Sequence, residues 1–81
     1  MMSGLWFYPP VYVATKQVGL TRGVNNVRVA AEELLEWDKR GAKWRKAVQA
    51  CIDAEEGRAS ADEVRKAFEA AAKDADLWRA P

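Results

Sequence analysis

The chain has 81 residues, which suits one domain, and a domain of this size hides only about 60% of the surface that its unfolded chain exposes. Thirteen Lys and Arg against twelve Asp and Glu give a net charge of +1, which excludes the strong charge asymmetry typical of nucleic-acid and membrane-surface binders. The single cysteine excludes an intramolecular disulfide, so we expect a reducing compartment, the cytoplasm.

The first part of the chain is aromatic and then β-branched. The apolar segment 5–8 is interrupted by Pro9-Pro10 and has no basic region before it, so it predicts neither a signal peptide nor a membrane span. The diproline cannot extend a central strand, and the β-branched residues after it predict a strand over about 11–15. A turn from Lys16 to Gly19 then leads into a second strand over about 20–24.

Three helices are predicted after this hairpin. Asn25-Asn26 supplies N-cap side chains for a helix over about 26–39, and Gly41 suits the left-handed residue that ends it. A second helix follows over about 42–56 and is closed by Gly57. A third, over about 61–76, opens on the Ser and Glu of a capping box at positions 60 and 63.

These elements predict an α+β fold. A two-stranded hairpin is marginal in water, so its apolar face must lie on the helices. We therefore expect one compact domain, residues 1–81, in which an N-terminal two-stranded β-hairpin is followed by three amphipathic helices packed on it. Trp44 and Phe68 occupy the apolar stripes of adjacent helices, and both are predicted to be largely buried.

One ordered pattern of residues runs through these elements: Pro10-Val11, Ala31, Leu34-Leu35, Trp37, Gly41, Trp44, Ala47, Cys51, Gly57, Arg65, Phe68, Ala71-Ala72 and Ala75. In this order and spacing, which covers about Phe7 to Ala75, the chain resembles the domain-of-unknown-function nine-eighty-two family of small alphaproteobacterial proteins. The resemblance implies a free-standing bacterial domain with this fold, and it carries over no activity and no catalytic residue. Asn25-Asn26 and Asp38 depart from the expected pattern and bear only on helix ends.

The residues that usually carry chemistry are absent or isolated. Histidine is missing, which removes the commonest general base and metal ligand. Cys51 lies on an apolar stripe, where we predict a core thiol with a raised pKa. Glu32, Glu33 and Glu36 make an acidic face, but a cation site needs six or more oxygen ligands and nothing nearby completes one. We expect no cofactor and no metal.

Two hypotheses remain, both of binding, because no spacing of carboxylates, lysines and tyrosines indicates a set of catalytic residues. The leading one is a small cytoplasmic protein-interaction or self-associating module without catalytic activity, with Trp6, Phe7, Tyr8 and Tyr12 as its candidate contact residues. A homodimer that pairs equivalent strand edges is slightly favoured over a monomer in which the N-terminal segment folds back over the helices. Lys16 and Arg22 are possible charged guards of that edge. The alternative is a nucleic-acid-binding accessory protein that uses the basic patch Lys39, Arg40, Lys43, Arg45 and Lys46. Trp44, within this patch, is more typical of core than of a base-stacking platform.

Overall fold

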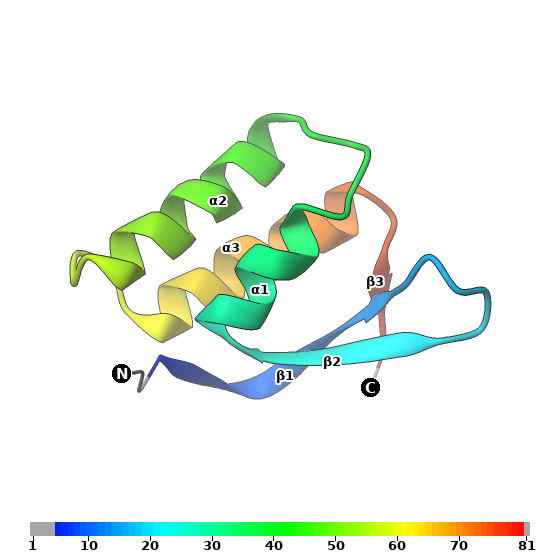
Figure 1. The fold of residues 1–81 in the computed structure, drawn as a ribbon, viewed down its shortest axis with the longest axis horizontal. Coiled ribbons are helices and arrows are strands. Elements are labelled where there is room, and N and C mark those ends of the chain that lie inside the picture. The colour runs from blue at the N-terminus through cyan, green and yellow to red at the C-terminus, as the bar shows by residue number, and fades with distance from the viewer. Residues whose placement is uncertain (1–4, 81) are drawn as a thin grey trace.

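The computed structural model describes residues 5–80, which form an α+β fold with the helices on one side and a sheet on the other. The elements are β1 (Trp6–Ala14), β2 (Thr21–Asn26), α1 (Val27–Leu34), α2 (Ala42–Glu55), α3 (Ala61–Asp74) and β3 (Trp78–Arg79). The antiparallel sheet has the order β2-β1-β3, and all the helices lie on one of its faces (Figure 1). The predicted fold class is confirmed, with a third strand that the sequence interpretation did not include.

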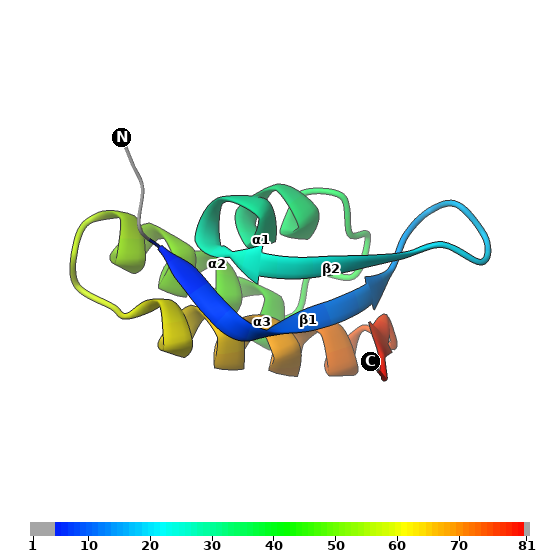
Figure 2. The same ribbon diagram turned by 90° about the horizontal axis from the view of Figure 1, so that it is seen from below.

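The helices form two tiers above the sheet. α1 packs against β2 and α3 against β1, whereas α2 packs on α1 and α3 and lies farther from the sheet (Figure 1). Seen from the uncovered face of the sheet, α1 extends beyond the free edge of β2 (Figure 2). Within residues 5–80, the sheet therefore has one face covered by helices and one face that no helix covers.

β1 begins at Trp6, five residues before the predicted start at 11. Its pairing with β2 is irregular between Trp6 and Val11, where the register shifts. β3 pairs with Tyr12 and Val13, and among the described residues no strand lies on the β3 side of Pro9-Pro10. The strand therefore tolerates the two prolines, because an irregularly paired segment at the margin of a sheet does not need the N–H groups that proline lacks.

The first helix is shorter than predicted, because α1 ends at Leu34 and not near 39. A tighter turn follows, in which the Glu36 N–H donates to Glu33 O and the Trp37 N–H donates to Leu34 O. Arg40 then satisfies the freed carbonyls, since its Nη2 donates to Leu35 O and its Nε to Trp37 O. The turn sends the Trp37 side chain into the core, where only 5% of it is exposed.

Gly41 accordingly has a different role from the one predicted. It is the N-cap of α2, with a φ of −86°, and not the left-handed residue after α1. The other predicted helix signals are confirmed: Asn26 caps α1 through Val29 N–H, and Ser60 and Glu63 form the capping box of α3. Gly57, after α2, has a φ of +81°, a conformation that favours glycine.

The core lies between the sheet and the helices and is centred on Phe68. The ring of Phe68 is fully buried and packs on Trp37, with ring centroids 5.4 Å apart. Its predicted burial is confirmed. Trp44 is only half-buried: its ring lies under Arg40 and its Nε1 donates to Leu34 O at 2.7 Å. The prediction that Trp44 is largely buried was therefore too strong, because its indole bridges the core and the surface.

We expect Phe68→Ala to destabilise the protein by about 3 to 5 kcal/mol, because it removes a fully buried aromatic ring and leaves a cavity. Urea denaturation followed by circular dichroism measures this change. Val18→Ala is the control, since Val18 is fully exposed at the hairpin turn and its truncation should leave the midpoint unchanged. Equal midpoints for the two variants would contradict this description of the core.

Cys51 is a core thiol, 4% exposed, and burial raises its pKa from an ordinary 9.0 to about 11, with a further contribution from the nearby Glu55 carboxylate. The native thiol should react slowly with a maleimide at neutral pH and rapidly in urea.

The raised pKa also predicts a pH dependence of stability. Because burial favours the protonated thiol, the contribution of Cys51 to the free energy of unfolding is complete below pH 9 and is lost as the pH rises to about 11.

The measurement is the stability of the parent relative to Cys51→Ala across that pH range. The difference should shrink between pH 9 and 11. Fast labelling of the native protein near neutral pH would overturn the assignment of Cys51 to the core.

Candidate protein-interaction surface

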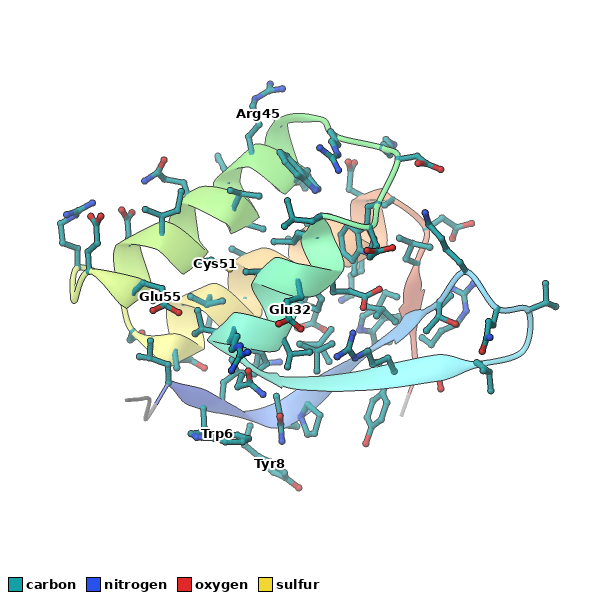
Figure 3. The ribbon with its side chains drawn as sticks, viewed as in Figure 1. Trp6, Tyr8, Glu32, Arg45, Cys51 and Glu55 are labelled. Atoms are coloured by element: carbon teal, nitrogen blue, oxygen red, sulfur yellow. The ribbon has the colours of Figure 1, made fainter. Side chains whose placement is uncertain are left out.

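The uncovered face of the sheet carries exposed aromatic side chains. Residues of β1 alternate between its two faces: Phe7, Val11 and Val13 point into the core, whereas Trp6 and Tyr8 are 63% and 84% exposed. In Figure 3 the Trp6 and Tyr8 side chains project from the sheet on the side away from the helices. Of the four aromatic residues proposed for protein contact, Phe7 is thus a core residue and does not belong to this surface.

Tyr12 belongs to the same face but is half-buried, because it lies against the neighbouring strand. Tyr12 pairs with Gly23 of β2, and a Cβ added at Gly23 would come within 2.9 Å of Tyr12 Cε1. The tyrosine ring therefore occupies the space that a side chain at position 23 would take. We define the aromatic face as the face of the sheet that carries Trp6, Tyr8 and Tyr12.

The aromatic face contains little charge. None of the three strands contains an Asp or Glu. Arg22 pairs with the inward-facing Val13, and its Nη1 reaches Glu33 of α1, so its side chain is on the helix side. Arg79 pairs with Tyr12 and is the one charged strand residue on the aromatic face. A partner surface there meets apolar rings, polar groups and one cation.

The proposed basic patch is only partly free for phosphate binding. The guanidinium of Arg40 is engaged by backbone carbonyls and stacks on Trp44 at 4.7 Å from the ring centroid. Lys39 contacts Asp74 of α3, donating to its backbone oxygen at 3.0 Å. Lys43, Arg45 and Lys46 are exposed on α2. Since Arg40 covers Trp44, the patch lacks the accessible ring that base stacking needs.

A second surface lies along the free edge of β2. The Thr15 N–H donates to Leu20 O, while the Ala14 N–H donates to Leu77 O on the opposite side of β1. Hydrogen-bonding direction alternates along a strand, so the backbone groups of Arg22 and Val24 face β1. Those of Thr21 and Gly23 point outward, where the described part of the sheet has no further strand.

Beside this edge is an open cleft of about 710 Å³ between the hairpin and α1. It is lined by Thr15, Lys16, Gln17, Leu20, Thr21, Arg22, Glu32, Glu33 and Glu36. Figure 3 shows Glu32 on the side of α1 above β2. The acidic residues noted in the sequence thus form one wall of a cleft, a placement that only the fold could reveal.

The charges in the cleft are organised in pairs. Arg22 lies 3.2 Å from Glu33 and Lys16 lies 3.8 Å from Glu36, while Arg28, next to the cleft, lies 3.5 Å from Glu32. Glu33 is 5% exposed, whereas Glu32 and Glu36 remain exposed and can accept further hydrogen bonds. Arg22 therefore contacts a carboxylate of α1 and Lys16 contacts one in the turn after α1, so neither stands as an unpaired guard of the edge.

Two further features concern metals and membranes. Within residues 5–80, no group of three or more Cys, Asp and Glu side chains is arranged to hold a metal ion. None of the described helices is long and apolar enough to cross a membrane.

Comparison with known proteins gives a family but no activity. Neither the curated proteins nor the solved structures searched contain a significant match. A family model described as "Protein of unknown function (DUF982)" matches residues 9–78, which include the whole helical layer, β2 and most of β1, but not Trp6, Phe7 and Tyr8 at the start of β1. The chain therefore belongs to the DUF982 family of proteins of unknown function.

Proposed function

We propose that this protein is a cytoplasmic, non-catalytic interaction module that binds a second copy of itself through the aromatic face. The observation that carries the proposal is the exposure of Trp6 and Tyr8, 63% and 84%, side by side on a sheet face without helices. Large aromatic residues are enriched at the centres of protein interfaces, where they give most of the binding energy.

The composition of the face supports a second copy as the partner. A two-fold axis through the face brings the same residues together from both chains, so the surface must be complementary to itself. The aromatic face has no carboxylate and a single arginine, which limits like-charge repulsion between copies. The indole N–H and phenol O–H groups can form hydrogen bonds across the contact while the rings pack.

We expect a dimer at high micromolar concentration that becomes a monomer in Trp6→Ser/Tyr8→Ser, measured by light scattering on a sizing column. The variant should fold with a stability within about 0.5 kcal/mol of the parent, because both side chains are exposed in one chain. Val18→Ser/Ile52→Ser is the matched control: it removes two exposed apolar side chains elsewhere and should remain dimeric.

A monomeric parent at that concentration would contradict self-association. Capture from a native lysate, with and without nuclease, then distinguishes the remaining partners. A protein retained by the control variant and lost from Trp6→Ser/Tyr8→Ser would make the partner a foreign protein. Nuclease-sensitive capture that depends on Lys43, Arg45 and Lys46 would favour the nucleic-acid hypothesis.

A further inference from the structure

The free edge of β2 and the cleft beside it form a binding groove that is separate from the aromatic face. We propose that this groove takes an extended, cationic segment of a partner protein, which adds to the sheet as a strand next to β2. The inference does not rest on self-association, because it uses different residues on a different side of the sheet.

The backbone of β2 supplies the first part of the argument. Thr21 and Gly23 direct their N–H and C=O groups outward, as the alternation along the paired strand requires. Two such residues offer two donors and two acceptors at the spacing of an added strand. Strand addition to an open edge is a common mode of peptide recognition, in which backbone hydrogen bonds give affinity and alternate side chains give specificity.

The position of α1 determines what can occupy this edge. α1 extends beyond β2, so it lies over the place that a neighbouring strand would take (Figure 2). A second copy that paired its β2 about a two-fold axis would bring its own α1 into the same space. A single extended segment has no helix to collide and fits between β2 and α1, where the cleft of about 710 Å³ lies.

Exposed carboxylates beside the cleft select the side chains of the segment. The lining of the cleft contains Lys16 and Arg22 against Glu32, Glu33 and Glu36, and Arg28 next to the cleft pairs with Glu32, so each carboxylate has one cation near it. Glu32, on α1, and Glu36, in the turn after α1, keep more than half of their side-chain surface exposed. Lysine or arginine at alternate positions of the added strand would face these carboxylates, and Leu20 offers an apolar contact at the hairpin end.

The test uses a nine-residue blocked peptide that alternates lysine and threonine, titrated into the ¹⁵N-labelled protein. We expect the amide signals of Thr21 and Gly23 to shift and their hydrogen exchange to slow, with affinity falling as salt is added. Glu32→Gln/Glu36→Gln should weaken binding by about 3-fold to 30-fold, the equivalent of two exposed ion pairs. The matched control Glu55→Gln/Glu56→Gln changes the same charge at the end of α2 and should bind as the parent does.

Two control peptides separate strand addition from simple charge attraction. The peptide with glutamate in place of lysine should not bind, and neither should a lysine peptide with proline at three threonine positions, since proline removes strand donors. No binding of the lysine peptide at millimolar concentration would overturn the proposal, as would equal binding of the proline peptide. Trp6→Ser/Tyr8→Ser should bind the lysine peptide normally, so failure of self-association and failure of this groove are distinguishable.

Discussion

The buried carboxylate of Glu33 connects the parts of this small fold. Its Oε1 accepts from Arg22 of β2 at 3.2 Å, and its Oε2 accepts from the indole of Trp37 at 3.4 Å. Trp37 in turn packs on Phe68 of α3. One side chain therefore joins the sheet, the turn after α1 and the centre of the core. A buried carboxylate that lost these donors would be costly, so the three elements are held in one arrangement.

The same contact explains how the two proposed interaction surfaces arise. An inward-pointing charge on an edge strand is a device that discourages pairing, but the charge of Arg22 is met by Glu33 within the chain. The β2 edge thus remains open to an added strand beneath α1. On the opposite side of the sheet, alternation along β1 places Phe7 in the core and leaves Trp6 and Tyr8 exposed. Both surfaces follow from how β1 and β2 are fixed to the helical layer.

Local signals predicted much of this fold, and long-range contacts account for what they missed. The capping box at Ser60 and the Asn26 cap follow from side chains within a few residues, and α2 lies between Gly41 and Gly57, so sequence reasoning found these helix ends. The early end of α1 depends on Trp37 reaching Phe68, and no local pattern reveals that contact. β3 has two residues and exists because it pairs with β1. The sequence predicts the aromatic segment as a contact region, a prediction that remains to be tested, and its division into Phe7 inside and Trp6 and Tyr8 outside needed the structure.

A double-mutant cycle on Arg22→Met and Glu33→Met, measured by urea denaturation, tests most directly whether this ion pair joins the sheet to the helices. If it does, the loss of both side chains should cost less than the sum of the single losses, with a coupling of at least about 0.5 kcal/mol. The single variant Arg22→Met leaves a buried carboxylate with one donor fewer, and its cost should fall in the Glu33→Met background. Losses that add within about 0.3 kcal/mol would show that Arg22 and Glu33 act independently and would contradict the central role given to Glu33.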